Sequence, residues 1–294
     1  MKTLSKLVST SSISLLVITS PVLISGSHKK LDYSSSATTI AASSYTHNST
    51  NISAERNFKF NSAVAAVTTT TAVTVNKEDA ALDLAAKKAL EVKMTIVEAT
   101  NIYATMNLAK SGLNQKAFEY AWRGYHNMVK NGTLTKTNVL SICDFTQSSR
   151  RKRLYVIDVA NKKLLYNTYV SHGMNSGVEY ATTFSNKANS FKTSLGFYMT
   201  TKTYVGRNGL SLKVKGLEKG YNDQAARRGI VLHGSDYIGY DYLQNNGEMG
   251  RSLGCTAIPN AVNGKIIKSI KNGSLFFIYH PTKKYLNEST IING

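Results

Sequence analysis

The chain has 294 residues, which is enough for one or two domains with a sizeable core. Lysine and arginine number 36 against 17 aspartate and glutamate residues, so the formal net charge is +19. Such a balance favours polyanionic surroundings, although a solvated basic surface would account for it equally well. For an exported chain those polyanions are carboxylate-bearing wall polymers and acidic membrane surfaces, which excludes nucleic acid as a partner.

Residues 1–27 are typical of a secretory signal. Lys2 and Lys6 give a positive start, an apolar stretch runs from Ile13 to Ile24, and Ser25-Gly26-Ser27 offers small residues for cleavage. The apolar stretch is short for a membrane span, although an uncleaved anchor is the alternative. Because no cysteine follows it, we do not expect lipoprotein processing. We predict export to the periplasm or cell envelope.

Residues 28–75 are rich in Ser, Thr, Ala and Asn, with thinly spread charges. They offer little apolar surface to offset the entropy of ordering, so we predict a low-complexity linker. The run from Val64 to Val75 has β-prone character, but we assign no strand to it.

Two helices are predicted over residues 76–132, a helical segment packed on the domain that follows. The first begins near Asn76, which can cap it, and ends by Gly112. Its apolar residues recur at spacings of four and three and form one stripe: Ala85, Ala89, Val92, Ile96, Ala99, Tyr103 and Met106. Because this stripe is short and rich in alanine, it favours packing on a neighbouring element over a coiled-coil seam. A second helix is predicted over 114–130, with Gly132 after its end.

Strand patterns begin after Arg150. Leu154–Val159 and Leu164–Val170 flank the polar turn Asn161-Lys162-Lys163, which predicts a hairpin. Glycines punctuate further short β-rich runs, and Ser274–Tyr279 reads as a last apolar strand. With only three prolines in the chain, this pattern predicts a β-sandwich or barrel-like domain over residues 133–294.

The stretch from Arg228 to Pro259 carries the candidate chemistry. An apolar run ends in His233-Gly234, and Cys255 follows about twenty residues later, after a polar excursion and directly behind Gly254. A cysteine is a good nucleophile only as thiolate, and a neighbouring histidine lowers its pKa and handles the proton. Gly254 leaves room for a substrate backbone, and amides around the cysteine suit an oxyanion. The ordinary alternative is a buried, inert cysteine and a core histidine.

His233-Gly234, a gap of seventeen residues and Ser252-x-Gly254-Cys255 together resemble the signature of the L,D-transpeptidase catalytic domain (YkuD-type). The run from Arg251 to Ala257 resembles the murein L,D-transpeptidase subfamily. The resemblance covers about residues 115–281 and includes three upstream stretches, Phe184–Asn186, Ser194–Tyr198 and Gly216–Gly220. It implies an α+β fold, a mostly antiparallel β-sandwich with an amino-terminal helical segment. Leu253 and Ala257 depart from the commoner His and Arg of the family, so roles that depend on those side chains are not carried over.

The resemblance implies a peptidoglycan L,D-transpeptidase. Cys255 would be the nucleophile and His233 its base, with the Gly234 carbonyl orienting the imidazole. Attack on the meso-diaminopimelate carbonyl at stem position three would release the terminal D-residue and leave a thioester, which an amine resolves. The resemblance also implies chemistry without metal or cofactor, insensitivity to most penicillins and inactivation by carbapenems. As partners we expect peptidoglycan stem peptides and peripheral contact with wall or membrane, for a monomeric protein.

Several side chains around this pair have candidate roles. Arg251 and Arg228 flank the motif, and either is suited to hold a substrate carboxylate by bidentate bonds, unless both are ordinary exposed arginines. Ser252 either donates to the cysteine or the oxyanion, or shapes the turn. His172 follows a strand end as His233 does, so it lines the same cleft or lies on a surface loop. The Cys and His spacings match no zinc pattern.

The second cysteine, Cys143, lies in an apolar run and is expected to be a packed thiol. We expect no disulfide with Cys255, because a bridge would consume the nucleophile.

Three other functions stay open. Water in place of the amine would make the enzyme an L,D-carboxypeptidase, and a non-catalytic wall-binding protein would keep the same fold, basic surface and linker. A papain-like protease would also use Cys and His, but there the Cys precedes the His along the chain.

Overall fold

The structure, a computed structural model, describes residues 77–294. The predicted signal, the linker over 28–75 and the capping Asn76 lie outside the described residues. The division into segments at residues 27, 75 and 132 therefore stays a prediction. Among the helices of residues 77–294, none combines the length and hydropathy that crossing a membrane requires.

Helices α1 (Lys77–Thr105) and α2 (Gln115–Lys130) form the amino-terminal part of the described chain. The apolar stripe of α1 packs on α2 in its second half, where the Tyr103 ring lies 5.9 Å from that of Phe118 and Trp122 Nε1 donates to Glu98 at 3.0 Å. All residues from 78 to 90 are exposed, so the predicted stripe is used only from Val92 onward.

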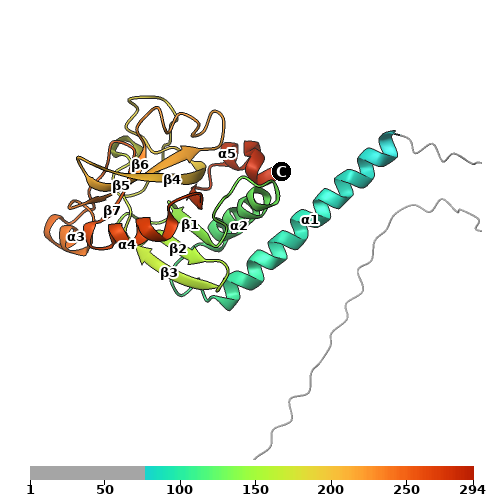
Figure 1. The fold of residues 1–294 in the computed structure, drawn as a ribbon, viewed down its shortest axis with the longest axis horizontal. Helices are drawn as coiled ribbons and strands as arrows, with labels where there is room; N and C mark the ends of the chain where they lie inside the picture. Colours follow the sequence, from blue (N-terminus) through green and yellow to red (C-terminus); the bar gives the residue numbers. More distant parts are fainter. Residues whose placement is uncertain (1–76) are drawn as a thin grey trace, which may run out of the picture. The chain divides into compact units, whose positions relative to one another are not determined.

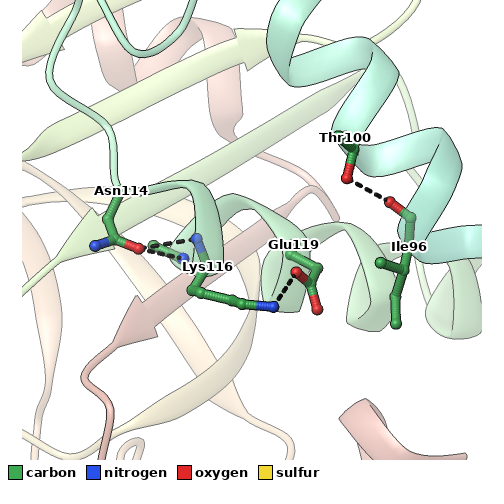
Figure 2. Close-up of polar contacts among 6 residues, drawn as sticks. Ile96, Thr100, Asn114, Lys116 and Glu119 are labelled. Atoms are coloured by element: carbon green, nitrogen blue, oxygen red, sulfur yellow. Dashed lines mark hydrogen bonds and ion pairs between the residues drawn. The ribbon is translucent and has the colours of Figure 1, made fainter. Parts of the chain in front are cut away.

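Asn114 caps α2, which confirms the second predicted helix. Its side-chain oxygen accepts from the backbone amides of Lys116 and Ala117, at 2.8 and 3.3 Å. Figure 2 shows this cap beside the Lys116–Glu119 ion pair of the first turn, with α1 and its Thr100–Ile96 bond nearby. The first turn of a helix leaves its amides without helical partners, and the cap satisfies two of them.

Eight strands form one hydrogen-bonded sheet in the order β3-β2-β1-β8-β4-β5-β6-β7. Five of the seven neighbouring pairs are antiparallel, and β1–β8 and β6–β7 are parallel. The strands, labelled in Figure 1 except for β8, are β1 (Val139–Asp144), β2 (Leu154–Asp158), β3 (Lys163–Thr168), β4 (Gly196–Gly206), β5 (Gly209–Gly216), β6 (Val231–Ser235), β7 (Thr256–Pro259) and β8 (Leu275–Tyr279).

This arrangement confirms the predicted α+β fold with a mostly antiparallel sheet, the β2–β3 hairpin and the final strand. The sheet curls until the chain leaving β3 meets the β7 edge: the Ser171 amide donates to the Ala257 carbonyl at 2.8 Å, and the Ala257 amide donates to Ser171 Oγ at 2.9 Å. Right-handed strand twist accumulates into such curvature. The predicted sandwich is thus a single sheet whose two edges approach each other.

The remaining helices are short. They are η1 (Met174–Ser176), α3 (Tyr240–Asn246), α4 (Asn260–Ile270), α5 (Lys283–Glu288) and α6 (Thr290–Asn293). Ile266, Ile267 and Ile270 of α4 are buried in the main core, together with the apolar strand β8. Cys143 is also fully buried there and free, as predicted.

Two of the upstream stretches that resemble the family meet at the buried carboxylate of Glu218. It accepts from the Phe197 amide and from the Tyr285 hydroxyl, both at 2.8 Å. Gly196 passes so close that a Cβ there would lie 2.1 Å from Glu218 Oε2, and its φ of +111° also favours glycine. These stretches therefore join β4, the segment after β5 and the carboxyl-terminal helices.

We expect Asn114→Ala to lower the free energy of unfolding by about 1 kcal/mol, because two amides of the first turn lose their acceptor. Urea denaturation monitored by circular dichroism measures it. Asn101→Ala, at an exposed position within α1, is the matched control and should cost nothing, since alanine is the better helix former. Equal effects of the two changes would contradict the capping role.

Candidate active site

The parallel pairing of β6 with β7 brings the two halves of the motif together. Leu232 pairs with Thr256 and His233 with Ala257, and Cys255 immediately precedes β7, beside Val231. Successive side chains along a strand point to opposite faces. Cys255 and His233 therefore lie on the same face of the sheet, at diagonal positions on neighbouring strands. Leu232 and Ile258, on the other face, belong to the main core.

His233 is oriented by the backbone. The residue is 4% exposed, and Nδ1 lies 2.8 Å from the Gly234 carbonyl oxygen, the contact that the family resemblance implied. A carbonyl only accepts, so the proton is on Nδ1, which leaves Nε2 with the lone pair that a base needs. A Cβ at Gly234 would lie 2.2 Å from Asn260 Oδ1, so a larger residue there would have to displace the Asn260 side chain of helix α4.

The Cys255 thiol is half-buried, with Sγ 3.7 Å from the Gly229 carbonyl oxygen. Burial raises the pKa of the thiol, while the Val231 backbone and the charge of Arg228 act in the opposite direction without reversing the shift. The expected lowering of this pKa is thus absent from the resting site. At neutral pH the sulfur is protonated, and its activation requires a base at the moment of attack.

Ser252 shapes the turn that presents Cys255. Its hydroxyl donates to the Cys255 carbonyl at 2.6 Å and accepts from the Gly254 amide at 3.0 Å. Gly254 has φ +119°, and a Cβ there would lie 3.0 Å from the Lys192 carbonyl oxygen. Of the roles open to Ser252 in the sequence, the contacts favour turn formation. Because the Gly254 amide is already bonded, it is not a ready oxyanion donor.

The bonding of Arg228 corrects the prediction of a bidentate substrate contact. Nη1 donates to the Ser185 carbonyl and Ser194 Oγ at 2.8 and 2.9 Å, and Nη2 donates to Ser190 Oγ and the Lys192 carbonyl at 3.3 and 2.6 Å. With all four of its Nη donors in use, Arg228 holds the loop behind Gly254 and supplies positive charge near the sulfur. Arg251 has only a 4.0 Å contact with Glu248 and is 29% exposed, so it retains room for a ligand.

The placement of His172 corrects the other predicted substrate contact. The ring is 0% exposed, with Nδ1 2.7 Å from Arg153 Nη2 and Nε2 3.1 Å from the Gly177 carbonyl oxygen. Arginine only donates, so Nδ1 accepts and the proton is on Nε2. Burial, and then the charge of Arg153, lower the pKa of His172 to about 4. The ring is neutral at neutral pH and lies beneath the site.

Sequence reasoning missed Arg153, which belongs to the basic run Arg150-Arg151-Lys152-Arg153. Nothing in such a run marks one member as buried, yet Arg153 is 0% exposed. Burial raises the pKa of Tyr237, and a negative charge on the nearby Cys255 would raise it further. Within residues 77–294, His, Cys, Asp and Glu side chains do not gather in threes with the geometry of a metal site.

Comparison with known proteins identifies a family for this chain. The family profile described as L,D-transpeptidase catalytic domain matches residues 109–279, more than half of the chain. Among curated proteins, no relative matches.

Solved structures with similarity to the chain include an L,D-transpeptidase from Mycobacterium smegmatis, at 13% identity over 49% of this chain with a TM-score of 0.30. An L,D-transpeptidase in complex with imipenem has 10% identity over 48% and the same TM-score, and one from Xylanimonas cellulosilytica has 19% identity over 42% and a TM-score of 0.25. The chain covers 59%, 59% and 55% of these structures, less than two thirds of each.

The buried, neutral His172 predicts an acid-sensitive fold. Below its ordinary pKa of 6.5 the unfolded chain binds a proton that the folded chain refuses until about pH 4. The contribution of neutral His172 to the free energy of unfolding is therefore fully present above pH 6.5. It decreases by up to about 3 kcal/mol as the pH falls to about 4. Urea denaturation at several pH values measures it.

His172→Asn is the matched variant, since its side-chain oxygen still accepts from Arg153 but does not titrate. The stability difference between the wild type and this variant should change across pH 4 to 6.5 and be constant above it. A difference that is independent of pH would contradict the assignment.

Proposed function

The chain belongs to the L,D-transpeptidase catalytic domain family, and from this premise we propose that it is a cysteine-dependent acyl-transfer enzyme that acts on peptidoglycan stem peptides. The observation that carries the proposal is the placement of Cys255 and His233 on one face of the β6–β7 pair, with the Gly234 carbonyl at 2.8 Å from His233 Nδ1. A nucleophile, a base and a group that orients the base are the parts that covalent acyl transfer requires.

In the proposed first half-reaction, His233 Nε2 takes the thiol proton as Cys255 Sγ attacks the carbonyl of the L-centre at stem position three. The tetrahedral intermediate carries an oxyanion, for which the Cys255 backbone amide is our candidate donor, because the Gly254 amide is bonded to Ser252. Collapse breaks the C–N bond, and the imidazolium returns its proton to the leaving amine of the terminal D-residue. A thioester remains on Cys255.

In the second half-reaction an acceptor amine loses its proton to His233 and attacks the thioester, which restores the thiol. With water as acceptor the product is a trimmed stem peptide, so transpeptidation and carboxypeptidation share this intermediate. Arg251, partly exposed beside the motif, is our candidate to bind a substrate carboxylate.

The setting of the enzyme is part of the same proposal. The signal pattern of residues 1–27, which lies outside the described residues, supports export to the periplasm or cell envelope. The formal charge of +19 supports peripheral contact with an anionic wall or membrane surface. We propose a monomer that works on stem peptides without a cofactor and is inactivated by carbapenems through Cys255.

Sacculi incubated with the chain that lacks residues 1–27 should gain three–three cross-links, detected by mass spectrometry of muropeptides. Cys255→Ala should abolish them, whereas Cys143→Ala is the matched control and should keep them, because that thiol is fully buried and out of reach of the substrate. Tripeptides without cross-links would identify water as the acceptor. Sacculi that the wild type leaves unchanged but binds would indicate a wall-binding protein instead.

The role of His233 is tested by His233→Gln, which keeps a polar side chain but removes the base. The rate of acylation by imipenem, followed as a mass increase on Cys255, should fall about 10²–10⁴-fold. Intact-mass measurements on Cys255→Ala should show no adduct. An acylation rate in His233→Gln within threefold of the wild type would overturn the assignment of the base.

A further inference from the structure

Arg153 is a buried cation whose close partners are neutral. Nε and Nη2 donate to the Val170 carbonyl at 3.2 and 3.0 Å, Nη1 donates to the Gln147 carbonyl at 2.9 Å, and Nη2 donates to His172 at 2.7 Å. The guanidinium also lies 4.6 Å from the centre of the Phe145 ring. Burying a charge without a contacting carboxylate is costly, and burial lowers the pKa of Arg153 to about 9.

Asp144 acts on Arg153 through its field and, after Cys143, raises the pKa of the guanidinium. Its carboxylate instead bonds the Asn114 amide, Thr146 and the Gln147 side chain. A hydrophobic side chain of similar volume would fill the position of Arg153 at lower cost. The directional bonds of the guanidinium are therefore what sets this residue apart from a packing residue.

His172 connects Arg153 to the turn that holds Cys255. Both ring nitrogens are bonded, so the ring has one orientation, and its own backbone carbonyl accepts from the Ser252 amide at 3.0 Å. Gly173 forms a bridge with Ser252, and the Met174 amide donates to the Ser252 carbonyl at 2.7 Å. The segment that carries His172 is thus paired directly with Ser252.

Ser252 in turn holds Cys255, whose carbonyl accepts from Ser252 Oγ at 2.6 Å and from Ser171 Oγ at 3.4 Å. Ser171 also exchanges hydrogen bonds with Ala257, two residues beyond the nucleophile. The contacts form one continuous path from Arg153 through His172 and Ser252 to Cys255. His233 is held separately, by β6 and the Gly234 carbonyl.

We propose that Arg153 and His172 are positioning residues for the acyl transfer, which act through Ser252 to fix Cys255 relative to His233. This inference rests on the proposed function. A displacement of about 1 Å in a reacting group costs on the order of 10² in rate even when the change lies far from the chemistry. The expected signature is a loss in kcat with KM retained, because neither residue touches the substrate.

The test compares kcat and KM for a stem tetrapeptide, together with the thermal midpoint, among variants of the two residues. His172→Leu removes both ring contacts, and Arg153→Lys keeps the charge but loses the fork that spans two carbonyls and the imidazole. Each should lower kcat about 10²-fold with KM within twofold. His172→Asn, which still accepts from Arg153, should recover most of kcat. His126→Asn, on α2, is the matched control and should change neither constant.

The double variant Arg153→Lys/His172→Leu should lose no more than either single variant, because both interrupt one path. Variants that fold, as judged by circular dichroism, but keep the wild-type kcat would overturn the proposal. So would single losses that multiply in the double variant. A wild type that turns over neither tetrapeptide nor imipenem would instead refute the proposed function, which keeps the two failures distinguishable.

Discussion

The candidate site depends on the parallel register between β6 and β7. Because side chains alternate between faces, a slip of one residue would move His233 or Cys255 to the opposite face and separate them. Parallel neighbours need a crossover connection, and the excursion over 236–255 provides it. That crossover has a small core of its own, formed by Ile238, Leu243, Met249 and Ala257. The apolar residues of the excursion thus serve the same purpose as the motif residues, because they bring the chain back in the correct register.

Backbone groups, more than other side chains, hold the candidate residues in place. The Gly234 carbonyl orients His233, and the Cys255 carbonyl accepts a hydrogen bond from the Ser252 hydroxyl. Carbonyls of a neighbouring loop accept hydrogen bonds from Arg228. The two positions that depart from the family pattern differ in their burial. Leu253 is 64% exposed, while Ala257 is 0% exposed within the crossover core, where an arginine would have no room.

Sequence patterns predicted what depends on local spacing. The second helix, the β2–β3 hairpin, the last strand and the packed thiol of Cys143 all follow from neighbouring residues. The contacts of the polar side chains could not be predicted from local spacing. Arg153 finds its partners 17 and 19 residues away, and Arg228 binds a loop between 34 and 43 residues away. Such partners are set by the closure of the sheet, so the burial of His172 and the engagement of Arg228 became visible only in the fold.

The raised pKa of Cys255 has a consequence for the resistance of its thiol to oxidation. Oxidation to sulfenic acid and exchange with small disulfides both proceed through the thiolate, so a thiol with a raised pKa reacts slowly with oxidants. Cys143, fully buried, offers no second thiol for an internal bridge. Under the proposed function, the burial that leaves Cys255 dependent on a base therefore also protects its thiol from oxidants between turnovers.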